Sequence, residues 1–184
     1  MKEKREAEIV RRVLLGDVQA FGALVREYQS PVYNLMFRMV GDKEKAADLA
    51  QDAFTRAYER LDSFKPGRRF FPWLYSVSLN IARDWLRANG RDRHVFVEDA
   101  AVLVREEDRA DDRDALHDRM DGAKAFDIVM RLDAKYREAL VLRYRYDFTM
   151  AEIAETLGTS LSGAKMRISR GLDMVRRKFD GGIL

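Results

Sequence analysis

The sequence predicts an all-α protein made of two small helical domains. Apolar residues recur at three-to-four spacing along most of the chain, helix caps and stops punctuate it, and only residues 95–97 (VFV) suggest a strand. The chain has 184 residues, of which 47% are hydrophobic, so a real core can form. We expect domains at residues 1–90 and 122–184, joined by a flexible acidic linker at residues 91–121.

The charge of the chain is distributed in three blocks. Residues 1–90 carry 16 Lys and Arg against 12 Asp and Glu, residues 91–121 carry 6 against 11, and residues 122–184 carry 12 against 8. Basic domains attract the phosphates of nucleic acid, whereas an acidic connector is repelled by them and stays mobile. On charge alone, two solvated basic surfaces explain the pattern equally well.

Composition also limits where the protein works and what it can bind. No stretch approaches the ~20 consecutive apolar residues of a membrane span, and the charged residues 1–5 are not followed by the apolar core of a signal peptide. We therefore expect a cytoplasmic protein. With no cysteine the chain has no disulfide and no Cys-ligated zinc, and we expect neither a metal nor another cofactor.

Helix caps define the first two helices of the N-terminal domain. Asp17 is a suitable N-cap for a helix over residues 18–29. Ser30 and Pro31 form an N-cap and first-position pair, which predicts a second helix from there to Gly41.

Two further helices complete this domain. Asp42 caps a third helix with a strong amphipathic stripe, formed by Ala46, Leu49, Ala50, Ala53, Phe54, Ala57, Tyr58 and Leu61. Residues 62–69 contain Pro66 and Gly67 and predict a loop. A fourth helix then begins at residues 70–72 (FFP) and runs to about Asn89. Its polar stripe is Ser76, Asn80, Arg83 and Arg87, and its expected inward face is Leu74, Val77, Ile81 and Trp85.

A helix-turn-helix is predicted near the C-terminus. Thr149 and Glu152 have the spacing of a capping box, which starts a short helix ending at Gly158. A second helix follows from about Leu161 or Ser162. The residues expected to face inward are Ile153, Ala154, Leu157, Ala164, Ile168, Leu172 and Val175.

The second helix has the pattern of a DNA recognition helix. At about 100° per residue, Met166 and Arg170 point away from Ala164 and Ile168, and Ser162, Lys165 and Ser169 flank them. Base-contacting side chains near the N-terminus and cations further along are what a major-groove helix requires. An ordinary helical hairpin with a solvated basic face is the simpler alternative.

Taken together, the motifs make the chain resemble an extracytoplasmic-function sigma factor of the primary-sigma superfamily. Three segments are similar to sigma region 2: residues 16–21 (GDVQAF), 48–54 (DLAQDAF), and 71–75 (FPWLY) with Asn80. Three more are similar to region 4: residues 139–144 (ALVLRY), 151–154 (AEIA) and 165–170 (KMRISR). Each motif is short, and their order and spacing along nearly the whole chain carry the resemblance.

The resemblance implies that the chain binds core RNA polymerase. In the family, the helix with the 48–52 motif docks on the clamp helices of the polymerase β′ subunit, and the β flap is a further contact. The polymerase-binding residues implied here are Asp48, Leu49, Gln51 and Asp52. The carboxylates of Asp48 and Asp52 repel one another at this spacing, and Lys45 and Arg56 relieve part of that repulsion. Binding to a basic partner would explain why the two acidic residues are placed together. A solvated helix face is the alternative.

The resemblance also implies two promoter contacts. For the −10 element, the 62–69 loop and the helix after it would hold a flipped base and its phosphates through Phe64, Lys65, Arg68, Arg69, Phe70, Trp73, Ser76, Asn80 and Arg83. Phe64, Phe70 and Trp73 could equally belong to the core, and Phe71 is expected there more than at a base. For the −35 element, the implied residues are Ser162, Lys165, Met166, Arg167, Ser169, Arg170 and Arg177.

The sequence departs from the family pattern at the start of the recognition helix. Residues 162–164 (SGA) stand where the family usually has Gly-Thr-Val, and Met166 stands where a small polar residue is common. The family also makes an anti-sigma factor an expected partner.

Three other classes of protein are alternatives to a promoter-recognition subunit. An operator-binding regulator would need a dimer and a palindromic site. An enzyme lacks support because His94 and His117 have no visible catalytic partners and no P-loop or GxGxxG motif is present. A sigma-like decoy that binds a regulator instead of DNA would not need a basic recognition helix.

Overall fold

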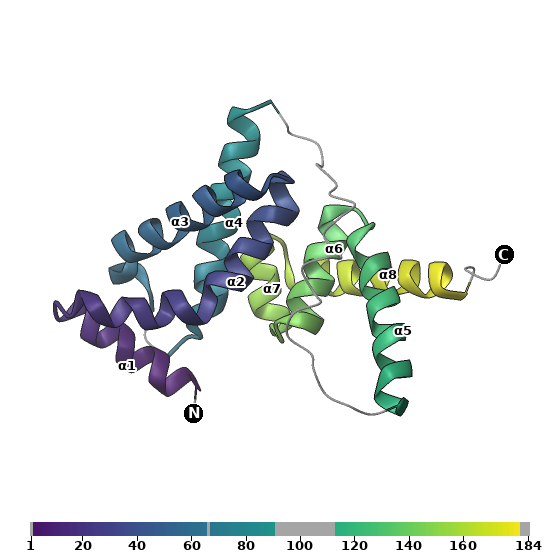
Figure 1. The fold of residues 1–184 in the computed structure, drawn as a ribbon, viewed down its shortest axis with the longest axis horizontal. Coiled ribbons are helices and arrows are strands. Elements are labelled where there is room, and N and C mark those ends of the chain that lie inside the picture. Colours follow the sequence, from purple (N-terminus) through teal and green to yellow (C-terminus); the bar gives the residue numbers. More distant parts are fainter. Residues whose placement is uncertain (1, 66, 91–112, 181–184) are drawn as a thin grey trace. The chain divides into compact units, whose positions relative to one another are not determined.

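The structure is a computed structural model that describes residues 2–65, 67–90 and 113–180 (Figure 1). Every regular element among these residues is a helix, which confirms the all-α prediction; residues 95–97 lie outside them. The chain divides into two compact units, residues 1–95 and 96–184. Within the described residues, no helix is long and apolar enough to cross a membrane.

The first unit contains four α-helices and two short 3₁₀ turns. In chain order they are α1 (Lys2–Leu14), η1 (Val18–Ala20), α2 (Phe21–Val40), α3 (Lys43–Glu59), η2 (Leu61–Ser63) and α4 (Phe70–Ala88). Helix α2 packs against α1, α3 and α4, so it runs through the middle of the unit. Its buried Leu24, Leu35 and Met36 meet a core completed by Leu74 and Tyr75 of α4.

Helix α1 was not predicted from the sequence. Most of its residues are charged and exposed, and it buries only Glu6, Val10 and Val13. Val10 and Val13 form an apolar pattern with Ile9 and Leu14, but this pattern occupies only the second half of a mostly charged helix. The helix packs on α2 and α4 through this narrow face.

The predicted helix break at Ser30 and Pro31 is wrong, because α2 continues through Pro31 without interruption. Proline removes one backbone hydrogen bond and costs about 3 kcal/mol inside a helix. On the far side of the proline, α2 buries Val32, Leu35 and Met36, each worth about 1.5–3 kcal/mol. Burial of this continuous face therefore outweighs the cost of the proline.

The other predicted caps of the first unit are present. Asp17 accepts a hydrogen bond from the Ala20 amide at the start of η1, and the Asp42 carboxylate accepts one from the Lys45 amide at 2.9 Å at the start of α3. Gly41 ends α2 in the left-handed conformation, with φ of 76°. The α3 stripe is buried as predicted except for Tyr58, which is exposed.

The second unit contains α5 (Arg113–Met130), α6 (Ala134–Leu140), a π-helical turn η4 (Val141–Arg145), α7 (Met150–Leu157) and α8 (Leu161–Asp180). Helices α5, α6 and α7 all pack on α8, which is the central helix of this unit. Phe148 and Ile153 are fully buried between these elements.

The first turns of α5 correct the predicted linker. The helix begins at Arg113, inside the segment 91–121 that composition assigned to a linker. Ala115, Leu116 and Met120 are strong helix formers, so this charged segment supports a helix without a clear apolar stripe. The rest of that segment, residues 91–112, lies outside the described residues.

Candidate nucleic-acid and protein interfaces

The predicted helix-turn-helix is formed by α7 and α8. The Thr149 hydroxyl accepts a hydrogen bond from the Glu152 amide at 3.2 Å, and the Thr149 amide donates to the Glu152 carboxylate at 2.7 Å, which confirms the capping box. Gly158 ends α7 with φ of 61°, a conformation that favours glycine. Ala154 is buried where the two helices pack.

The start of α8 is fixed by Ser160. Its hydroxyl accepts a hydrogen bond from the Gly163 amide at 3.0 Å, and it lies 3.0 Å from the Ser162 hydroxyl. A hydroxyl that accepts from the amide three residues on is a helix N-cap. The exposed Ser162 is therefore held at the tip of the helix, next to the turn.

Buried and exposed residues divide α8 lengthwise. Ala164, Ile168 and Gly171 are buried, and Leu172 and Val175 are half-buried. The predicted DNA-contacting residues that are exposed are Ser162, Lys165, Met166, Ser169, Arg170 and Arg177. Arg167 is half-buried, so it is less accessible than its neighbours. The exposed strip has three cations and two hydroxyls around one methionine.

On α3, three of the four predicted polymerase-binding residues are accessible. Asp48, Gln51 and Asp52 are exposed, whereas Leu49 is buried and belongs to the apolar stripe. The Lys45 ammonium lies 2.9 Å from the Asp48 carboxylate, and this hydrogen bond raises the pKa of Lys45.

Arg56, which was expected to relieve the Asp48 and Asp52 pair, forms its ion pair with another residue. Its guanidinium lies 3.5 Å from Glu59 instead, within the same helix. The α3 face therefore keeps an acidic patch, here defined as Asp48 and Asp52, with Lys45 as the cation beside it.

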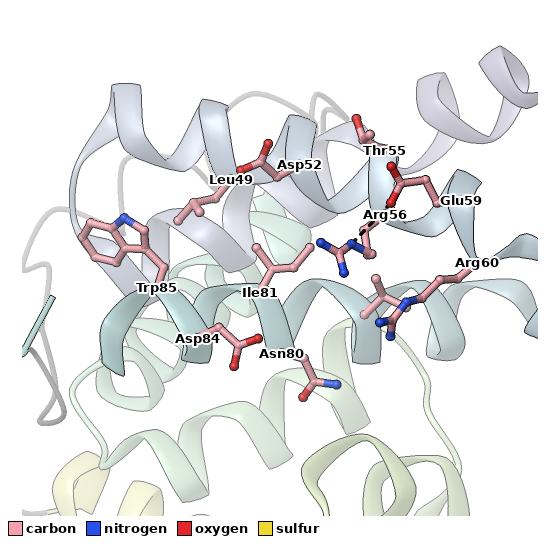
Figure 2. A pocket seen from close by; sticks show the side chains of 11 residues that line it. Leu49, Asp52, Thr55, Arg56, Glu59, Arg60, Asn80, Ile81, Asp84 and Trp85 are labelled. Atoms are coloured by element: carbon pink, nitrogen blue, oxygen red, sulfur yellow. Dashed lines mark ion pairs between the residues drawn. The ribbon is translucent and has the colours of Figure 1, made fainter. Parts of the chain in front are cut away.

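A groove of about 510 Å³ runs between α3 and α4 (Figure 2). It is lined by Leu49, Asp52, Thr55, Arg56, Glu59, Arg60, Val77, Asn80, Ile81, Asp84 and Trp85. Val77, Ile81 and Trp85 of α4 were expected to face inward. All three are only half-buried, because they line this groove. The groove thus joins Asp52 of the acidic patch to Asn80 of the predicted −10 face.

Aromatic rings of the 62–69 loop and of the start of α4 pack together. Phe64 and Phe70 are buried, 6% and 0% exposed, which favours the core alternative for these two side chains over a base contact. The centroids of their rings lie 5.6 Å apart, and each lies 5.5 Å from the ring centroid of Trp73. Only Trp73 is half-buried and reaches the surface. Such aromatic packing holds the described part of the loop in place.

Phe71 belongs to the core, which is where the sequence placed it in preference to a base contact. Its ring stacks on that of Tyr28 at 4.7 Å. The Tyr28 hydroxyl donates a hydrogen bond to the buried carboxylate of Glu6 from α1. Burial, reinforced by this hydrogen bond, raises the pKa of Tyr28, so the phenol stays protonated and remains the donor.

The cations of the 62–69 loop differ in accessibility. Lys65 and Arg68 are exposed, while Arg69 is half-buried and its guanidinium lies 3.7 Å from the Glu3 carboxylate of α1. This ion pair was not predictable from the sequence, because the helix that carries Glu3 was itself not predicted.

The polar stripe of α4 is only partly accessible. Asn80 is exposed, and Arg83 and Ser76 are half-buried. The Ser76 hydroxyl donates to the Pro72 carbonyl at 2.9 Å, within its own helix. Arg87 pairs with Asp84 at the surface.

Comparison with known proteins identifies the family. Family models for Sigma-70 region 2 and Sigma-70, region 4 match residues 24–92 and 126–175. The ECF RNA polymerase sigma factor SigW of Bacillus subtilis is 32% identical over 175 residues, covering 92% of this chain and 94% of SigW. The RNA polymerase sigma-H factor of Pseudomonas aeruginosa is 31% identical, covering 95% of this chain and 94% of that protein.

The chain belongs to the extracytoplasmic-function sigma factors of the sigma-70 family. This sigma factor is therefore not an enzyme but an initiation factor, which acts with core RNA polymerase and recognises promoters. Its region 2 match lies in the first unit and its region 4 match in the second.

Two solved structures have a similar fold. CnrH, solved in complex with the cytosolic domain of CnrY, is 25% identical with a TM-score of 0.64, over 96% of this sigma factor and 98% of that chain. RpoE of Bartonella quintana, solved with the anti-sigma factor NepR, is 23% identical with a TM-score of 0.61, over 89% and 98%. The likeness to RpoE concerns the fold alone.

Proposed function

We propose that the acidic patch on α3 is the surface that docks on the β′ clamp helices of core polymerase. Asp48 and Asp52 are exposed one turn apart, and Gln51 is exposed beside them. Like charges at this spacing oppose helix formation, so their value lies in attracting a basic partner. Leu49 would act from beneath, by holding α3 against the core.

For the −10 element, we propose that Lys65, Arg68 and Arg69 hold DNA phosphates while Trp73 stacks on an unpaired base. The buried Phe64 and Phe70 would support Trp73 rather than touch DNA. Single-stranded DNA binding combines cations along the backbone with an aromatic platform for the bases. On α4, Asn80 is the accessible polar side chain, with Ser76 and Arg83 beside it.

For the −35 element, we propose that α8 lies in the major groove with its exposed strip toward the bases. A capped helix-turn-helix whose second helix has cations and hydroxyls opposite its buried face carries this proposal. Arg177, near the helix end, would contact phosphate.

We propose that the working domains are residues 1–90 and the C-terminal segment, which begins with α5 at Arg113 rather than at residue 122. We also propose that the β flap contacts the chain in the holoenzyme, and that the chain works in the cytoplasm, where core polymerase and DNA are found. CnrH and RpoE were each solved with a second protein, which supports an anti-sigma factor as a partner here.

Reconstitution with core RNA polymerase tests the proposal directly. The purified chain should direct transcription from promoters selected out of a random DNA pool, and core polymerase without it should not. If the chain binds a palindromic DNA site as a dimer without polymerase and supports no transcription, it is an operator-binding regulator and the proposal is wrong.

A further inference from the structure

One large apolar side chain lies in the middle of the exposed strip of α8. Met166 is 46% exposed, with the serine hydroxyl of Ser162 one turn before it and the guanidinium of Arg170 one turn after it. About half of this apolar side chain is left in water, between polar neighbours on both sides. That surface is available to a partner of α8.

The packing of α8 leaves no room for Met166 in the protein core. Ala164 and Ile168 are 0% and 5% exposed and occupy the direction opposite to Met166. At about 100° per residue, no rotation of the helix buries Met166 without exposing these two. Met166 is therefore free to meet a partner of α8.

The chemical groups exposed in the major groove of DNA indicate which of them Met166 would contact. Among the four bases, only thymine presents a methyl group there; guanine, adenine and cytosine present acceptors and amino groups. Ser162, Lys165 and Arg170 supply polar contacts for those groups, and Met166 supplies none. A flexible, polarisable thioether suits a small apolar surface such as a methyl group.

We propose that Met166 selects thymine at one position of the −35 element by packing on its C5-methyl group. This inference rests on the proposed placement of α8 in the major groove, and it assigns a base preference to one named residue. The methyl group is the recognised feature, so removing it should matter even when base pairing is unchanged.

Replacing thymine with deoxyuridine tests the inference, because deoxyuridine lacks only the methyl group. The full chain is assembled with core polymerase, a preferred −35 sequence is selected from randomised promoters, and each thymine is then replaced singly. At one position the wild-type holoenzyme should bind about fourfold more weakly, the factor that corresponds to ~0.8 kcal/mol for one buried methyl group.

Two variants separate the contact from general effects on DNA. Met166→Ser should bind thymine and deoxyuridine equally at that position. Met174 is also a methionine of α8, lies two turns further along the helix and is 37% exposed. The Met174→Ser variant should therefore keep the wild-type preference for thymine. The comparison cancels any intrinsic effect of deoxyuridine on the duplex.

The possible failures are distinguishable. If no sequence is enriched at −35 by the holoenzyme, the proposed function of α8 is wrong. If a −35 sequence is selected but wild type binds thymine and deoxyuridine equally at every position, only the inference is overturned. It is also overturned if Met166→Ser weakens binding while keeping the full preference for thymine.

Discussion

Gly171→Ala should destabilise the second unit although alanine is the better helix former. A Cβ atom at Gly171 would lie 2.9 Å from Cδ1 and 3.1 Å from Cγ of Leu140. Carbon atoms pack at about 3.5–4.0 Å, and Leu140 is 2% exposed with little space to retreat. Overpacking costs about 1–3 kcal/mol and the helix gains about 0.5–1 kcal/mol, so the net loss is about 0–2.5 kcal/mol and centres near 1 kcal/mol.

The two tryptophans of the chain make this measurable without dividing the protein. Both lie in α4, so tryptophan fluorescence follows unfolding of the first unit alone, while far-ultraviolet circular dichroism follows helices of both units. Gly171→Ala should lower the melting temperature of the second unit by about 4–8 °C per kcal/mol and leave the fluorescence transition in place.

Gly122→Ala is the matched control. Gly122 is also helical, in α5, but an added Cβ meets nothing within 4 Å, so this substitution reports the helix gain alone. It should stabilise the second unit. If the Gly171→Ala protein is as stable as the Gly122→Ala protein, the prediction is wrong. That result would mean that the Leu140 side chain moves away from the new methyl group without any loss of stability.

Three further predictions address the proposed contacts. Asp48→Lys combined with Asp52→Lys should abolish co-elution with core polymerase at unchanged thermal stability, since both side chains are exposed. Alanine at the three cations of the 62–69 loop should leave polymerase binding intact but reduce permanganate reactivity of promoter thymines, with a shallower salt dependence. In binding selections with holoenzyme, Arg170→Ala should relax preference at one or two −35 positions by about 1–3 kcal/mol, whereas Arg177→Ala should weaken all sequences alike.

Different results would reassign these surfaces. Normal co-elution of the double aspartate variant would mean that α3 does not carry the polymerase contact. Unchanged permanganate reactivity would remove the loop cations from promoter melting. A uniform loss of affinity in Arg170→Ala would make that residue a phosphate contact.

Elements with a strong local signal were predictable from the sequence. The apolar stripe of α3 repeats over four turns, and the capping box at Thr149 with the glycine stop at Gly158 fixes both ends of α7. In each case the residues that decide the structure lie within a few positions of one another. Local patterns were therefore sufficient for these helices and for the exposed strip of α8.

What could not be predicted depends on contacts between distant residues. Pro31 looks like a helix start until the burial on both sides of it is known, and Glu3 meets Arg69 only because α1 folds back along the unit. Phe64 and Phe70 lie beside several cations in the sequence, as aromatic residues do in a DNA-binding loop, yet their rings pack on one another. Residue type alone does not distinguish an aromatic that stacks on a base from one that supports it.

The lengthwise division of α8 also has an evolutionary consequence. Ala164, Ile168 and Gly171 hold the helix in its unit, while Met166 and Arg170 contribute nothing to that core. Substitutions at exposed positions usually change stability by less than about 0.5 kcal/mol. A duplicated gene can thus acquire a new set of target promoters through changes on this strip, without any compensating mutation elsewhere in the fold.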